Sequence, residues 1–139
     1  MTTTTNITRK QVPNNKRIQH TAALFGVNFP LHFEPFVYAI TGKIADDYDG
    51  GYWEFYELSN GGFYMAPLSD TPFQVSCENG YEGELSGDAL GIAACLYAYS
   101  NLSFSGKSGF DETCARQYHW LRDYMLEHLE ARAILGAID

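Results

Sequence analysis

Histidines and cysteines are the residues of this chain that could bind a metal ion. A metal site needs ligands held close together, and His or Cys pairs at short spacing are its usual sign. The four histidines and three cysteines form no such pair, and the nearest candidates for two ligands are His32 with Glu34 and Cys114 with His119. The first pair straddles a predicted loop, and the second is five residues apart on a predicted helix, where the side chains point in different directions. We therefore expect no metal ion and no cofactor.

The cysteines could instead act as nucleophiles. Cys77, Cys95 and Cys114 are odd in number and widely spaced, which is typical of reduced thiols in a cytosolic protein rather than of a disulfide framework. A reactive thiol needs an exposed, electropositive pocket. Cys77 lies on the apolar side of a predicted strand and Cys95 in an alanine-rich predicted helix, both among acidic residues. We expect these thiols to be buried and unreactive.

Paired carboxylates offer a third chemistry, general acid–base catalysis. Four glutamates fall on predicted strands that could share one region of a sheet: Glu54, Glu57, Glu82 and Glu84. A hydrolase that uses this cluster is one hypothesis. The alternative, which we favour, is that these glutamates occupy the wet faces and edges of strands, where charge discourages association between sheets. We therefore expect no catalytic residues.

The element that positions many of these groups is an aromatic stretch over residues 49–67, which a Gly-Gly pair opens and Asn-Gly-Gly interrupts. Asn60 and Gly61 can both adopt a positive φ at low cost, as a two-residue hairpin turn requires. The pattern predicts antiparallel strands over residues 52–59 and 62–66. Both faces of this hairpin are largely apolar, so we expect helices to cover part of each face.

The predicted turn also sets the pairing between the two strands. Counting outward from it, Gly62 lies opposite Ser59 and Tyr64 lies opposite Glu57. This register places Tyr64 on the same face as Trp53. Asn60, Gly61 and Gly62 are then structural residues of the turn.

The run from Asp49 to Pro67 resembles the signature segment of the ArdB/KlcA antirestriction proteins, which plasmids and other mobile elements carry. Three flanking pieces are similar too: Val12-Pro13, Leu24-Phe25-Gly26 and the small-residue helix after Ser86-Gly87-Asp88-Ala89. The resemblance covers roughly residues 12 to 130. The resemblance implies an antirestriction protein that relieves host type I restriction of incoming DNA, without catalysis and without binding DNA itself. The partner that it implies is a host protein, either the type I restriction complex or a factor acting with it.

Helices are predicted where apolar residues recur at helical spacing. Residues 16–25 form either a short helix or an extended lead-in that places Ile18, Leu24 and Phe25 on the core. Residues 36–48 repeat an apolar residue every four positions, and Pro35 suits a first turn, so we favour a helix over the competing strand at 36–40.

The second half of the chain adds a hairpin and two more helices. Strands are predicted over residues 73–77 and 81–84 around a second Asn-Gly turn. A helix capped by Ser86 covers residues 89–99; Asp88 complements its positive end, and its small residues let it lie close against the sheet. One long helix runs from Ser108 or Asp111 to Gly136. Leu129 belongs to the apolar face of that long helix.

These elements together predict an α+β fold. We expect one small antiparallel sheet of three or four strands, packed by at least three helices, in a single domain over residues 16–139. Residues 1–15 are rich in Thr and Asn and lack apolar periodicity, so we expect them to be a mobile N-terminal tail.

The charge of −8 is unevenly distributed along the sequence. The first 17 residues contain four basic residues and no acid, whereas residues 34–88 contain eleven acids and only Lys43 as a base. A body this negative repels a phosphate backbone, so direct DNA binding is not expected outside the basic tail. No apolar run is long enough to span a bilayer, so we expect a soluble, cytoplasmic protein with no membrane partner and no small-molecule substrate.

A domain of this size is too small to bury every ring of the aromatic hairpin. We expect part of it to form a contact surface for a protein partner, since Trp and Tyr contribute most to such contacts. The candidate residues are Tyr52, Trp53 and Tyr64, with Asp46, Asp47 and Asp49 nearby. An alternative is a DNA mimic, whose carboxylates occupy the DNA site of the restriction enzyme; 17 acids in 139 residues is a modest density for that role.

Overall fold

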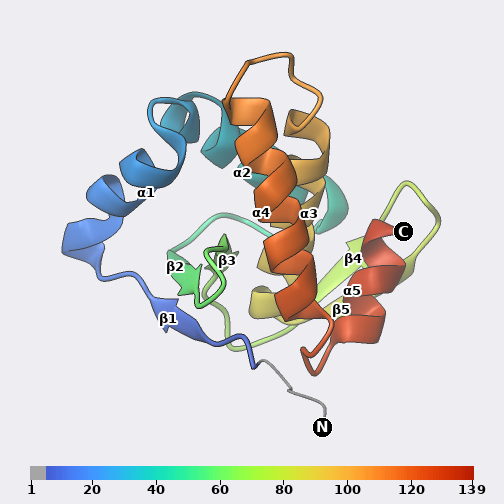
Figure 1. The fold of residues 1–139 in the computed structure, drawn as a ribbon. Coiled ribbons are helices and arrows are strands. Elements are labelled where there is room, and N and C mark those ends of the chain that lie inside the picture. Colours follow the sequence, from blue (N-terminus) through green and yellow to red (C-terminus); the bar gives the residue numbers. More distant parts are fainter. Residues whose placement is uncertain (1–5) are drawn as a thin grey trace, which may run out of the picture.

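Helix α3, Gly87–Leu102, runs through the middle of the molecule, and the other elements pack around it (Figure 1). The structure is a computed structural model that describes residues 6–139. Eleven of the 16 residues of α3 are buried, and the helix contacts β3, α2, α4 and α5. The predicted cap is confirmed, since the Ala89 amide donates to Ser86 Oγ over 3.1 Å.

Small residues let α3 lie directly on the strand β3, Phe63–Pro67, as the alanine-rich sequence predicted. A Cβ atom added at Gly91 would lie 2.4 Å from the Cα of Ala66 and from the carbonyl oxygen of Met65. Glycine is therefore required at this contact because the two backbones leave no room for a methyl group.

The α+β fold class is confirmed, but the strands form two sheets rather than one. The first sheet has the antiparallel order β1-β2-β3, in which β1 is Arg9–Gln11 and β2 is Trp53–Leu58. The expectation of a mobile tail over residues 1–15 is wrong from Arg9 onward, because β1 pairs with β2 and Val12 is buried. Residues 1–5 of that tail lie outside the described residues.

The β2–β3 hairpin forms in a register one residue away from the predicted one. Tyr56 pairs with Tyr64 and Glu57 with Phe63, so Tyr64 lies on the Tyr56 face and not on the Trp53 face. The loop has three residues rather than two, since the Leu58 amide donates to the Gly62 carbonyl and only Gly61, at φ +100°, takes a positive φ. A type I turn closed by a glycine in this way is the second common hairpin connection.

The second sheet is a hairpin of β4, Phe73–Ser76, and β5, Glu82–Leu85. Its turn repeats the first one: Gly80 has φ +91°, and the Cys77 amide donates to the Tyr81 carbonyl. In each turn the asparagine before the glycine accepts a hydrogen bond from the amide two residues later, and its side-chain nitrogen donates to a helix. Asn60 Nδ2 donates to the Trp120 carbonyl over 3.0 Å, and Asn79 Nδ2 to the Gly136 carbonyl over 2.9 Å.

The N-terminal half supplies three helical elements. After a 3-10 turn at Asn14–Lys16, α1 spans Arg17–Phe25, a π-helical turn spans Phe29–Phe33, and α2 spans Glu34–Ile44. The choice of helix over strand for α2 is therefore confirmed.

The expected burial of Ile18 on α1 is wrong, because this side chain is 86% exposed. The expected burial of Phe25 is confirmed, Leu24 is half-buried against the core, and Thr21 is the other buried residue of α1. Phe25 stacks on Phe33 at 5.3 Å, and Phe33 stacks on Tyr99 of α3 at 4.7 Å, so α1 reaches α3 through a column of rings.

The predicted single long C-terminal helix is two helices, α4 at Phe110–Met125 and α5 at Ala131–Ile138. The chain leaves the helix near Leu126 because His128 turns inward to bond Asp88, and its ring accepts a hydrogen bond from the Glu130 amide. Leu129 is fully exposed as a result, and Gly136 lies inside α5 rather than at its end. No helix within residues 6–139 is long and apolar enough to cross a bilayer.

Candidate functional site

Two of the six predicted contact residues are inside the protein. Trp53 is 4% exposed and its Nε1 donates to the Tyr48 hydroxyl over 2.9 Å, while Tyr64 is fully buried. Neither can touch a partner in this conformation. The shifted register explains the burial of Tyr64, because it turns this side chain toward the N-terminal turn of α3.

The remaining four predicted residues are exposed and precede β2. Tyr52 is 45% exposed, and Asp46, Asp47 and Asp49 are exposed as well. Asp47 accepts a hydrogen bond from the Gln74 amide of β4 over 3.2 Å, so this acidic segment lies beside the second sheet. Their role as a contact surface stays a prediction.

Tyr52 is held in place by Arg17, which points inward from α1. One guanidinium nitrogen of Arg17 donates to the Tyr52 hydroxyl over 2.9 Å and to the Trp53 carbonyl over 2.6 Å. The guanidinium also lies over the Phe55 ring at 4.2 Å. Arg17 therefore joins α1 to the start of β2 through both polar contacts and a cation–π contact.

The four glutamates of the hydrolase hypothesis are not brought together. Glu54 and Glu57 lie on β2 of the first sheet, whereas Glu82 and Glu84 are exposed on β5 of the second. Glu54 bonds the Gln11 side chain, and Glu57 lies 3.5 Å from His20 Nδ1. These carboxylates have separate surroundings, which is not the arrangement that acid–base catalysis by a pair requires.

The thiols are buried, and no residue set within positions 6–139 combines three His, Cys, Asp or Glu side chains at metal-binding distance. Burial raises the pKa of the Cys95 thiol to about 12, and burial with the nearby charge of Asp111 does the same for Cys114. Burial also raises the pKa of Cys77. At neutral pH all three are protonated, and a protonated thiol is a poor nucleophile.

A polar cluster that the sequence did not reveal joins four separate parts of the chain. Asp88, in the first turn of α3, accepts hydrogen bonds from Arg9 of β1 at 2.6 Å, from the Tyr64 hydroxyl at 2.7 Å and from His128 Nε2 at 2.8 Å. Next to it, Glu130 accepts from the Ser86 amide over 2.9 Å. We call Arg9, Tyr64, Asp88 and His128 the Asp88 cluster.

The chemistry of the Asp88 cluster fits a structural role. Burial alone would raise the pKa of Asp88, but the hydrogen bonds from His128 and Tyr64 and the charge of Arg9 outweigh it and hold the pKa below its ordinary value. Burial and the adjacent carboxylate raise the pKa of the Tyr64 hydroxyl. His128 Nδ1 accepts from the Glu130 amide, so neither ring nitrogen is free to act as a base.

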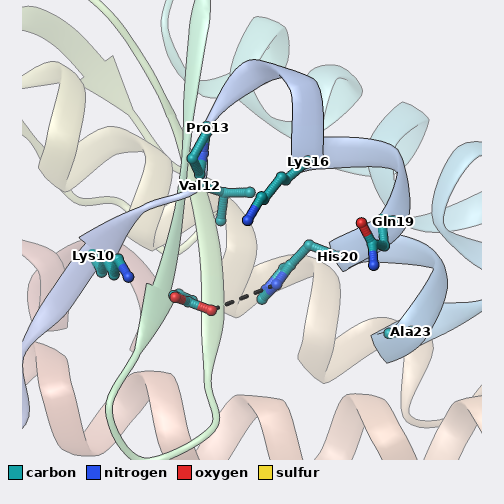
Figure 2. Close-up of a pocket in the computed structure, with 8 residues that line it drawn as sticks. Lys10, Val12, Pro13, Lys16, Gln19, His20 and Ala23 are labelled. Carbon is teal, nitrogen blue, oxygen red and sulfur yellow. Dashed lines mark ion pairs between the residues drawn. The ribbon is translucent and has the colours of Figure 1, made fainter.

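A pocket of about 350 Å³ opens between β1 and α1 (Figure 2). Its lining includes Lys10, Val12, Lys16, Gln19, His20 and Glu57. The dashed line in Figure 2 marks the ion pair from His20 to Glu57, and the labelled Lys16 amine extends toward the same space. We call this hollow the β1–α1 pocket; its polar lining carries two lysines and one carboxylate.

Comparison with known proteins decides the family. A sequence model of the antirestriction proteins matches residues 46–139, more than half of the chain. This chain belongs to the antirestriction protein family. Two KlcA antirestriction proteins of Escherichia coli are 38% and 40% identical to it, each over 96% of this chain and at least 94% of its own length. The chain is also 38% identical to the uncharacterized protein YafX of Escherichia coli K12, over 96% of this chain and 88% of YafX.

The fold of this antirestriction protein is also that of a solved relative. A structure from work on KlcA and ArdB matches it with a TM-score of 0.90 and 35% identity, over 100% of this chain and 99% of that one. That work describes a novel fold and antirestriction activity against type I DNA restriction systems in vivo but not in vitro.

The residues that sequence reasoning missed in this antirestriction protein are mostly polar groups that join distant segments. Arg9 and His128 are 119 positions apart in the sequence yet meet at Asp88. Asp88 was predicted only to complement the positive end of a helix. Charge and spacing carry no signal for such a contact, because it depends on how α3, β1 and the α4–α5 connection pack.

Proposed function

We propose that this protein relieves type I restriction of incoming DNA inside the host cell, to the benefit of the mobile element that carries it. It does so by binding a host protein and catalyses no reaction on DNA. The observation that carries the proposal is the full-length match to the KlcA and ArdB fold, whose activity is described in vivo but not in vitro. An activity that needs the cell points to a cellular component that a purified assay lacks.

The surface charge supports a protein rather than DNA as the direct partner. Acidic side chains lie exposed beside and on the second sheet, at Asp46, Asp47, Glu82 and Glu84. Phosphate groups would be repelled there. Four of the nine basic residues lie on the opposite, N-terminal side around β1 and α1, and two of these four, Arg9 and Arg17, already pair with carboxylates.

The chemistry of the interior supports a non-enzymatic mode of action. The three thiols are buried and protonated, the glutamates are distributed over two sheets, and the His128 ring is engaged at both nitrogens. A binding protein needs a stable surface and no reactive group, and the packing around α3 provides such a surface.

Phage plating tests the proposal. Unmodified phage is plated on a host with an active type I system, with and without this protein, and on a host that lacks the nuclease. We expect the protein to raise plating only on the restricting host and to leave the purified restriction enzyme active at equal concentration. Stoichiometric inhibition of the purified enzyme that weakens steeply with salt would identify a DNA mimic instead.

A further inference from the structure

We propose that the free edge of β1 is the docking site for an extended, acidic segment of the partner, which adds to the sheet as a fourth strand. The segment would lie beside the β1–α1 pocket. This docking site rests on the proposed function, because the acidic segment belongs to the host protein that the antirestriction protein binds.

The outward backbone groups of β1 are available for pairing. Thr8 and Val12 bond to Ser59 and Phe55 of the β2 side, which fixes alternate residues of the strand toward β2. Arg9 and Gln11 therefore direct their N–H and C=O groups away from the sheet. Within residues 6–139, none of these four groups has a hydrogen-bond partner.

The opposite edge of the same sheet is closed by side chains, which makes the open edge a specific feature. On β3, the Phe63 amide donates to Gln117 Oε1 over 2.8 Å, and the Phe63 carbonyl accepts from the Tyr99 hydroxyl over 2.7 Å. The Met65 amide donates to Cys95 Sγ over 3.5 Å. An exposed strand edge is a template for another strand, and within residues 6–139 the β1 edge is the one that stays open in this sheet.

The charge around β1 selects an acidic occupant. Lys10 lies on the face of the sheet that carries the β1–α1 pocket, and Lys16 lines that pocket from the α1 side. Neither lysine forms an ion pair with another residue in the part of the chain that the structure describes. Alternate side chains of an added strand would lie on this face, so Asp or Glu there would meet free ammonium groups.

A second copy of this chain fits the edge poorly. Antiparallel pairing of two β1 strands about Lys10 would place basic residues directly opposite each other, and like charges across a strand pair are destabilising. An extended acidic segment would place carboxylates opposite these basic residues, which is stabilising, and would form the same main-chain hydrogen bonds.

Two substitutions at one position separate edge pairing from every other role of β1. Gln11→Pro removes the outward N–H and places a ring in the path of an added strand, yet leaves the bonds to β2, because a proline is tolerated when its nitrogen faces away from the ladder. Gln11→Ala is the matched control, since both variants lose the Gln11 bond to Glu54. We expect Gln11→Pro to lower phage protection at least about tenfold relative to Gln11→Ala, with both proteins folded.

The charge is tested separately. Lys10→Glu should lower protection about three- to tenfold in protein that is still folded, with a small drop in melting temperature because Lys10 lies opposite Glu57 and the change places like charges across the strand pair. If Gln11→Pro melts well below Gln11→Ala, a loss of protection could come from unfolding, and Lys10→Glu then tests the docking site.

Four outcomes would overturn the docking site or its acidic occupant. Equal protection by folded Gln11→Pro and Gln11→Ala would do so while leaving the proposed function intact, and full protection by Lys10→Glu would remove the acidic partner. A wild-type dimer that Gln11→Pro converts to a monomer would identify a second copy as the occupant. Wild-type protein that gives no protection at all would overturn both the docking site and the proposed function.

Discussion

Replacing Gly91 by alanine tests the contact between α3 and β3, on which the whole arrangement depends. The added Cβ would lie 2.4 Å from Ala66 Cα, Ala66 Cβ and Met65 O, more than about 1 Å inside ordinary contact distance. None of these atoms can move by a side-chain rotation, so the helix must shift away from the strand. Overpacking of this kind costs about 1–3 kcal/mol, and its upper end applies here.

The helical preference of alanine works in the opposite direction. Alanine gains up to about 1 kcal/mol over glycine inside a helix, so the clash must exceed this gain. We expect a net loss of about 2–3 kcal/mol in the free energy of unfolding, and a melting temperature about 8–12 °C lower. Urea unfolding followed by circular dichroism measures the first quantity, and calorimetry the second.

Gly42 provides the matched control for this experiment. It also lies in a helix, α2, but a Cβ there would meet no atom within 4 Å. Gly42→Ala should therefore raise stability by about 0.5–1 kcal/mol. If Gly91→Ala is as stable as Gly42→Ala, the close approach of α3 to β3 is not what requires glycine, and the reasoning fails.

Three further predictions follow from individual side chains. Asp88→Asn should lower stability by about 1–3 kcal/mol at pH 7. Because the folded pKa of Asp88 is lowered, its contribution to the free energy of unfolding is complete above the ordinary aspartate pKa of 3.8 and is lost as the pH falls through the folded pKa. Urea unfolding from pH 7 to 3 should therefore show the stabilities of the two proteins converging below about pH 4. Stability curves that stay parallel would contradict this. Trp53→Ala should cost about 3–5 kcal/mol and reduce soluble yield, because the ring is buried, and an unchanged unfolding curve would show that the ring is not part of the core. The triple change Asp46→Asn, Asp47→Asn and Asp49→Asn should alter stability by less than about 1 kcal/mol and, if this segment contacts the partner, should lower phage protection; full protection would exclude it from the contact surface.

The local elements of this protein could be predicted from its sequence where one physical preference dominates. Ser86 identified the start of α3, and the small residues of α3 indicated a close contact with the sheet. The register of the first hairpin was missed because Asn-Gly is compatible with both a two-residue and a three-residue hairpin loop. Asn60 keeps a negative φ and uses its side chain to accept from Gly62, which lengthens the loop by one residue.

The elements that depend on distant contacts could not be predicted. Strand β1 has only three residues, all exposed, and forms because β2 offers it a partner. The break between α4 and α5 depends on the bond from His128 to Asp88, 40 positions earlier. The expectation that only part of the aromatic hairpin is buried could not distinguish exposed Tyr52 from buried Trp53, its neighbour in the chain.

The two asparagine turns have a consequence for how the protein opens. Each turn is tied by its side-chain amide to a carbonyl of a helix, Asn60 to α4 and Asn79 to α5, so neither hairpin can fray without releasing its helix. Native-state hydrogen exchange should therefore resolve two foldons, one with the first hairpin and α4 and one with the second hairpin and α5, each exchanging as a unit. The Asp88 cluster links the two units, because Asp88 bonds both Tyr64 of the first hairpin and His128 between α4 and α5.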